Sequence, residues 1–214
     1  MENLAQTYCS LGRLTEAVNL EEPVLEKYTR LLGTEHLETI IAMGNLAQTY
    51  YNLGRFTEAL NLQESVLEKR TRLLGMEHLE TIIAMGNLAR TCYNLGRCTE
   101  ALNLEQQIPA KYTKLLGPEH NFTIWAQCNL AQTLQKLEQY TEAYNLLQEV
   151  VGKQTRILGP NHSDTLESLS QLAELEALQA NSSSTQADTI AIAVPKEKKM
   201  RLTVKSFKKF LHFK

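Results

Sequence analysis

Apolar residues recur every three or four positions along residues 38–53, and again along residues 57–74. This spacing puts them on one face of an amphipathic helix and leaves the polar residues on the other face. The apolar positions are Ile40, Met43, Leu46, Ala47, Tyr50 and Leu53, then Ala59, Leu62, Val66, Leu67, Leu73 and Leu74. Gly54 and Gly75 follow the two runs, as glycine commonly does after helix C-termini. The pattern predicts a helical hairpin whose second helix is capped by Thr57.

The hairpin pattern recurs with a period of 42 residues, and the first two units differ at 8 of these 42 positions. The four units are 3–44, 45–86, 87–128 and 129–170. A further helical pattern over residues 164–180 predicts a closing helix. Helical units of this size bury their apolar faces only against their neighbours. We therefore expect residues 1–180 to form one all-α domain, an α-solenoid of tandem helical hairpins.

Some positions depart from this regular pattern. Pro23 and Pro109 lie inside second helices, and each is expected to kink or break its helix at a cost of roughly 3 kcal/mol if nothing relieves it. Glu138 stands where the other units end the first helix with glycine. The chain begins inside a first helix, so an uncapped apolar end is expected, and with it self-association.

Three phrases at fixed spacing carry a family resemblance. They are Leu116-Gly117-Pro118-Glu119-His120, Asn45-Leu46-Ala47-Gln48-Thr49-Tyr50, and Gly54-Arg55 with Thr57-Glu58-Ala59. With these phrases, residues 3–180 resemble tetratricopeptide repeats of the kinesin light chain type. The resemblance implies a right-handed superhelix whose first helices line a concave groove for peptide segments of a partner. Where the family often has an aromatic residue in the second helix, this chain has Glu21, Gln63, Glu105 and Leu147.

The resemblance places a set of polar and aromatic residues in or beside this groove. They are Asn45, Gln48, Tyr51, Asn52, Asn87, Arg90, Tyr93, Asn94, Trp125, Asn129 and Gln132. An asparagine amide both donates and accepts hydrogen bonds, which suits a peptide backbone of any sequence. We expect Asn45, Asn87 and Asn129 to hold that backbone, and the aromatic residues with Arg90 to select side chains. The alternative is that the repeated asparagines bridge neighbouring helices and serve only the fold.

Histidine recurs once in each loop between units, as His36, His78, His120 and His162. One histidine per stacked unit leaves each far from the next, so helix capping or loop packing is expected and metal binding is not. The four cysteines lack the close pairing of a metal knuckle and are interpreted as packing thiols. The chain contains no phosphate-binding glycine loop, no His-Glu-x-x-His motif and no Gly-x-Ser-x-Gly motif. We expect neither catalysis nor a cofactor, a metal or a small-molecule substrate.

Charge is divided unequally along the chain. Residues 1–180 carry 14 basic and 22 acidic side chains, a net charge of −8, whereas residues 181–214 carry 8 basic and 2 acidic ones, a net charge of +6. Residues 181–186 have the composition of a flexible linker. Residues 196–214 read as a basic amphipathic segment for weak membrane or calmodulin-type contact, for nuclear import, or as a disordered tail. With no signal segment and no long apolar stretch, a cytoplasmic protein is expected.

These observations predict a non-catalytic scaffold that binds a peptide segment of a partner protein along the concave groove. One alternative is a structural repeat array inside a larger signalling or motor-adaptor assembly, growing by self-association of its helix edges. The other is association driven by the basic tail, with a membrane surface or with nucleic acid, which salt would weaken.

Overall fold

The computed structural model describes residues 2–193, with side chains from residue 4 to residue 179. Every regular element in this part of the chain is an α-helix, which confirms the expected all-α fold. In chain order the helices are α1 (Glu2–Ser10), α2 (Leu14–Leu32), α3 (Leu37–Asn52), α4 (Phe56–Leu74), α5 (Leu79–Asn94), α6 (Cys98–Glu105), α7 (Ile108–Leu116), α8 (Asn121–Lys136), α9 (Tyr140–Ile157) and α10 (Ser163–Ala193). The basic segment 196–214 lies outside the described residues.

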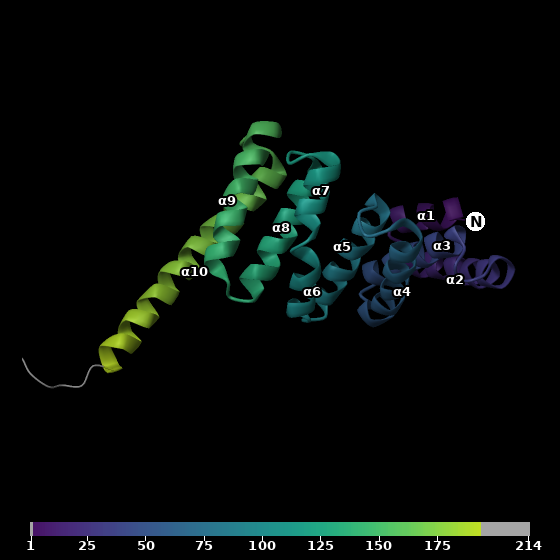
Figure 1. Ribbon diagram of the computed structural model, residues 1–214, viewed down its shortest axis with the longest axis horizontal. Helices are drawn as coiled ribbons and strands as arrows, with labels where there is room; N and C mark the ends of the chain where they lie inside the picture. The colour runs from purple at the N-terminus through teal and green to yellow at the C-terminus, as the bar shows by residue number, and fades with distance from the viewer. Residues whose placement is uncertain (1, 194–214) are drawn as a thin grey trace, which may run out of the picture.

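The helices follow one another in space as they do in the chain and form an elongated array with α1 and α10 at opposite ends (Figure 1). We call α1, α3, α5, α8 and α10 the first helices, and α2, α4, the α6–α7 pair and α9 the second helices. Each first helix packs against the second helices before and after it. Successive first helices also meet, α3 with α5 and α5 with α8. The predicted solenoid of stacked hairpins is therefore confirmed.

The hydrophobic core is spread along the array in separate clusters. One cluster combines Val18 of α2 with Leu46 of α3 and Ala59 of α4, so it joins two units. Ala47 and Ala59 are both fully buried, and Ala89 and Ala101 repeat this arrangement one unit later. The small side chains let the paired helices approach closely. Each unit is thus stabilised mainly by its neighbours, as the stacking of repeats requires.

The turn inside each hairpin is closed by a Schellman motif. In the second unit the N–H of Gly54 donates to the carbonyl of Tyr51, and the N–H of Arg55 donates to the carbonyl of Tyr50, both at 2.9 Å. Gly54 has a φ of +76°, a region in which glycine carries no steric penalty. In the fourth unit Glu138 occupies this place with a φ of +62°. The substitution noted in the sequence therefore keeps the turn but puts a side chain in a left-handed conformation.

The start of the second helix differs from the expectation. The residue that precedes α4 is Arg55, and Thr57 already lies inside the helix, so the predicted Thr57 cap is wrong. The Schellman motif ends at Arg55 and leads directly into α4, which leaves no intervening residue to act as a side-chain cap. Arg55 bridges the first turn instead, since its Nε donates to Glu58 Oε1 at 2.9 Å.

The two internal prolines have different outcomes. Pro109 lies in the first turn of α7, directly after an interruption between Glu105 and Ile108, as expected for a helix that breaks at proline. Proline is tolerated there because the N–H groups of a first turn have no partner within the helix. Pro23, by contrast, lies inside α2, which continues from Leu14 to Leu32 without a break. Of the kink or break predicted at Pro23, the break does not occur, and the buried Val18 and Val24 hold both halves of α2 against the core.

The loops between units carry a second repeated feature. Lys69 Nζ lies 2.6 Å from Glu35 Oε1, and Lys111 Nζ lies 2.5 Å from Glu77 Oε1 in the corresponding place one unit later. Hydrogen bonding to Lys111, and then to Lys114, lowers the pKa of Glu77. Each acidic loop residue is thereby tied to the second helix of the following unit.

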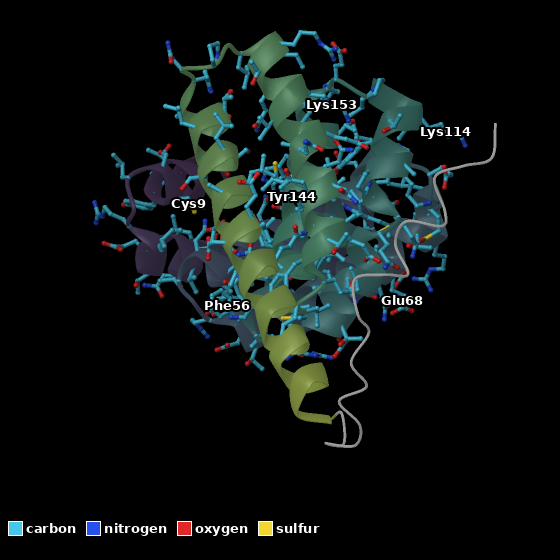
Figure 2. The ribbon with its side chains drawn as sticks, turned by 90° about the vertical axis from the view of Figure 1, so that its left-hand side faces the viewer. Cys9, Phe56, Glu68, Lys114, Tyr144 and Lys153 are labelled. Atoms are coloured by element: carbon cyan, nitrogen blue, oxygen red, sulfur yellow. The ribbon has the colours of Figure 1, made fainter. Side chains whose placement is uncertain are left out.

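The closing helix is longer than predicted. α10 runs from Ser163 to Ala193, so it crosses residues 181–186, where composition predicted a flexible linker. No glycine or proline occurs from residue 161 to residue 194, and Pro195 follows directly, which explains both the length of the helix and its end. Figure 2 looks along the array from the α10 end and shows Tyr144 of α9 beside α10, where its hydroxyl bonds to Glu176. Among residues 2–193, no helix has the length and apolar character needed to cross a membrane.

Candidate functional site

Three hollows lie in a row along the face that the first helices make. The first hollow, of about 20 Å³, lies between α1 and α3, and the second, of about 290 Å³, lies between α3 and α5. The third hollow, of about 710 Å³, lies among α5, α7, α8, α9 and α10, and we call it the wide hollow. Asn45 lines the first two hollows and Asn87 lines the last two, so each hollow adjoins the next in the row. We call this row the first-helix groove.

More than half of the residues predicted to bind a peptide line this groove. They are Asn45, Gln48, Asn87, Trp125, Asn129 and Gln132. The asparagines come from α3, α5 and α8, so the groove has one amide per unit at this position. Trp125 is 40% exposed and lies against Gly86 of α5, where a Cβ would be 3.8 Å from its ring. Contact with a peptide remains a prediction for all six residues.

Four other residues that were predicted to lie in the groove contact one another and Gln48 through hydrogen bonds and one cation–ring contact. They are Tyr51, Asn52, Arg90 and Asn94. Gln48 Nε2 donates to Asn52 Oδ1 at 2.8 Å, and Arg90 Nη2 donates to Gln48 Oε1 at 2.9 Å. The Arg90 guanidinium lies 4.2 Å from the centre of the Tyr51 ring, and Asn94 Nδ2 donates to the Tyr51 hydroxyl at 2.9 Å. This network joins α3 to α5 across two units. Its contacts correspond to the structural alternative, in which repeated polar residues bridge neighbouring helices.

Tyr93 belongs to the core rather than to the groove. Its half-buried ring packs against the cluster of Leu60, Leu88, Cys92 and Ala101, and this burial raises the pKa of its hydroxyl. Of the three aromatic residues predicted as anchors, Trp125 is therefore the one that lines a hollow.

Polar groups at the floor of the groove were missed by sequence reasoning. Gln63 lines the second hollow and Gln154 the wide hollow, and each is only 5% exposed. In the described part of the chain, the Oε1 atom of each lacks a hydrogen-bond partner. A buried acceptor without a donor is costly, so it marks a place where a ligand could supply one. The signal for Gln63 was present in the sequence, because it replaces an aromatic residue of the repeat pattern.

Buried carboxyl groups occupy the equivalent position in two other units. Burial raises the pKa of Glu105 to about 7, although the Thr133 hydroxyl opposes the shift. Burial also raises the pKa of Glu21, which lines the first hollow. Near neutral pH the Glu105 carboxyl is therefore present in its neutral form as well, which can donate a hydrogen bond as well as accept one.

The repeated histidines cap the first helices. His78 Nδ1 accepts a hydrogen bond from the N–H of Glu80 at 3.2 Å. The same bond, at the same distance, is made by His36, His120 and His162. The predicted capping role is confirmed. Between residues 2 and 193, no group of three or more His, Cys, Asp or Glu residues could hold a metal ion.

The repeat pattern also agrees with a known family. The tetratricopeptide repeat family matches residues 1–72, 45–108 and 122–184, which together cover most of the chain. The chain belongs to the tetratricopeptide repeat family. The resemblance identified from the sequence phrases is therefore confirmed. Among curated proteins, none matches the chain.

Comparison with solved structures shows which type of tetratricopeptide repeat this chain resembles. A candidate kinesin light chain from Podosopora anserina, with nearly identical repeats, is 31% identical and has a TM-score of 0.75, with 87% of this chain and 88% of that one covered. A variant of that protein with one substituted residue is 30% identical with a TM-score of 0.76 and the same coverage. BtubC from P. vanneervenii shares the fold at 13% identity, with a TM-score of 0.69 over 94% of this chain and 83% of that one. The chain is thus a kinesin light chain-like repeat solenoid, an architecture that serves as a protein interaction scaffold.

Proposed function

We propose that the first-helix groove binds an extended peptide segment of a partner protein, and that Asn45, Asn87 and Asn129 hold its backbone. The observation that carries the proposal is that each hollow of the groove adjoins the next. Each of these asparagines lines at least one hollow, and Asn45 and Asn87 each lie between two of them. A chain laid along the groove would pass the three amides in turn. Each amide could donate to a backbone carbonyl and accept from a backbone N–H.

The volumes of the hollows support a peptide rather than a small molecule that fills one enclosed cavity. The second hollow and the wide hollow, at about 290 and 710 Å³, could each receive side chains. The first hollow, at about 20 Å³, has room for little more than water. An occupant of the whole groove would therefore insert its larger side chains toward α5 and α8.

The test uses a triple substitution with a matched control. Asn45→Ala, Asn87→Ala and Asn129→Ala are combined in one variant, and Asn19→Ala, Asn61→Ala and Asn103→Ala in the other. The control asparagines repeat with the same period but are exposed on the second helices. Circular dichroism first shows that both variants keep the wild-type helix content.

Partners captured from the source cells are then mapped to a binding segment, and its Kd is measured for each variant. At about 1 kcal/mol for each amide contact, the groove variant should weaken binding roughly a hundredfold. The control variant should bind like the wild type. Equal affinities for all three proteins would reject the assignment of the groove asparagines.

The second candidate function is that of a self-associating structural array. Leu4 and Leu11, at the α1 end, are 49% and 66% exposed, which supplies apolar surface for a second copy. Light scattering over a hundredfold range of concentration tests this candidate, because self-association raises the mean mass with concentration. A constant monomer mass would remove it.

A further inference from the structure

The wide hollow differs from the second hollow in the chemistry of its lining. In the second hollow Arg70 Nη2 pairs with Glu80 Oε2 at 3.0 Å, and Arg70 Nη1 donates to the Glu80 carbonyl, also at 3.0 Å. One unit later the same two positions hold Tyr112 and Phe122, whose ring centres are 5.7 Å apart. Both rings line the wide hollow, together with Trp125. These two positions thus carry an ion pair in one unit and a pair of aromatic rings in the next.

The charges around the wide hollow are acidic. Asp164 and Glu167 of α10 line it, and among its described lining residues neither lysine nor arginine occurs. His162 is also present, but its Nδ1 already accepts the N–H of Asp164. Aromatic walls beside two carboxylates favour a cation, because the ring faces and the carboxylates both attract positive charge.

Gln154, at the floor of the wide hollow, has an amide oxygen that needs a hydrogen-bond donor. Its side chain is almost fully buried, at 5% exposure, and its Oε1 has no hydrogen-bond partner among the described residues. The amide oxygen needs a donor, so a ligand here should carry N–H groups as well as charge. A simple metal cation would not meet the aromatic part of the lining.

Elsewhere in the chain, one arginine contacts both an aromatic ring and a glutamine oxygen, as a ligand of the wide hollow would have to do. The Arg90 guanidinium stacks on the Tyr51 ring at 4.2 Å and donates to Gln48 Oε1 at 2.9 Å. Arginine suits such a place because its planar group stacks on rings, its five N–H groups donate in fixed directions, and its stem is apolar. The wide hollow has the ring and the glutamine oxygen of this arrangement, and it lacks the arginine.

We infer that the wide hollow binds an arginine side chain from the peptide segment of a partner protein. The inference rests on the proposed groove function and names the ligand of one part of that groove. The arginine stem lies against Trp125 and Phe122, and the guanidinium donates to Gln154 Oε1 and pairs with Asp164 and Glu167.

The partner is a separate protein rather than the tail of this chain. The tail contains one arginine, Arg201, eight residues beyond the end of α10 at Ala193. Fully extended, these eight residues reach roughly 28 Å. From Ala193 back to Glu167 along the helix is about 39 Å at 1.5 Å per residue. While α10 is intact, Arg201 can therefore approach the edge of the wide hollow at Gln171 but falls short of Asp164, which lies about 44 Å from Ala193 along the helix.

Trp125 provides the measurement, because it is the single tryptophan of the chain. The full chain is titrated with four short peptides of one alanine- and glutamine-based sequence, in which the central residue is arginine, lysine, citrulline or glutamate. Trp125 fluorescence should respond saturably to the arginine peptide. The lysine and citrulline peptides should bind at least threefold more weakly, and the glutamate peptide at least tenfold more weakly.

Two variants assign the contacts. Gln154→Met removes the amide oxygen at nearly constant size and should weaken the arginine peptide about tenfold. Its matched control is Gln148→Met, which changes an exposed glutamine of the same helix that does not line the wide hollow and should leave the affinity unchanged. Asp164→Asn with Glu167→Gln should also weaken the arginine peptide, and should remove its advantage over citrulline. Thermal unfolding by circular dichroism shows whether each variant is folded.

Three results would overturn the inference. The glutamate peptide could bind as tightly as the arginine peptide, or Gln154→Met and Gln148→Met could have equal effects. Arg201→Ala could raise the affinity of the full chain tenfold, which would show that the chain's own arginine occupies the hollow. In each case peptide binding that depends on Asn45, Asn87 and Asn129 would still support the groove. Loss of that dependence alone would reject the groove and leave the wide hollow as an isolated arginine site.

Discussion

Glu105 occupies, in the third unit, the position that Gln63 holds in the second. Both side chains are almost fully buried, and each has an oxygen without a partner among the described residues. The difference between them is the titratable proton. Burial raises the pKa of Glu105 to about 7, compared with 4.5 for an ordinary glutamate. A single residue therefore makes the stability of the array depend on pH.

We predict that Glu105→Gln stabilises the protein above pH 7 and leaves its stability unchanged near pH 4. Below pH 4.5 the carboxyl is neutral in both the folded and the unfolded chain. Between pH 4.5 and 7 the unfolded chain loses the proton first, so the free energy of unfolding of the wild type falls as pH rises. The pKa difference corresponds to about 3 kcal/mol at neutral pH and above. Urea unfolding of both proteins at pH 4 and pH 8 measures the effect, and an equal stability difference between the two proteins at both pH values would contradict it.

At the scale of the element, the hairpin turns keep one backbone geometry even where the residue at the turn differs. The Schellman turn after α5 uses Gly96 with a φ of +75°, and the turn after α8 uses Glu138 with a φ of +62°. Both turns make the same pair of backbone hydrogen bonds, so the geometry is set by the helices on either side. Glu138 accepts the conformation at a steric cost that glycine does not have.

We predict that Glu138→Gly raises the free energy of unfolding by about 1 kcal/mol, since it relieves the left-handed conformation of a residue with a Cβ. The reverse change one unit earlier, Gly96→Ala, should lower stability by a similar amount. No atom lies within 4 Å of a Cβ at Gly96, so the loss would come from the backbone and not from a clash. Thermal unfolding measures both variants. If Glu138→Gly instead lowered the free energy of unfolding, the contacts of the Glu138 side chain would contribute more stability than its left-handed conformation costs.

At the scale of the whole molecule, the contacts between units repeat with the sequence. Glu35 and Glu77 bind lysines at the same place in successive units, and residues 37–44 and 79–86 are identical. The units are therefore close to interchangeable along the first half of the array. The wide hollow, in contrast, depends on α5, α7, α8, α9 and α10 together.

We predict that a chain lacking residues 45–86 still folds. Joining Gly44 to Asn87 recreates the sequence of α5, and Glu35 takes the place of Glu77 opposite Lys111. Helix content per residue should stay the same by circular dichroism, while the unfolding temperature falls because one interface is lost. The emission of Trp125 should be unchanged, since the wide hollow remains. A non-cooperative melt would contradict this account.

Particular residues show how far prediction from sequence reaches. The histidine caps and the glycine turns were predicted, because both depend on a few adjacent residues. Pro23 and Pro109 lie at nearly the same position of the 42-residue repeat, yet α2 continues and the α6–α7 pair is interrupted. The structure shows this difference, and the position of each proline in the repeat did not predict it. Arg90 was predicted as a groove residue, and its ring partner proved to be Tyr51, in the preceding unit.

The amino-acid sequence by itself determined the period, the helical hairpins, the positions of the turns and the repeat family. These follow from spacing and from local backbone preferences, which repeat with each unit. Tertiary structure alone decided which polar residues bond to one another and which line the groove, because those contacts join residues about 42 positions apart. It also decided that one hollow is wide and acidic with aromatic walls, since five helices, α5 and α7 to α10, meet there.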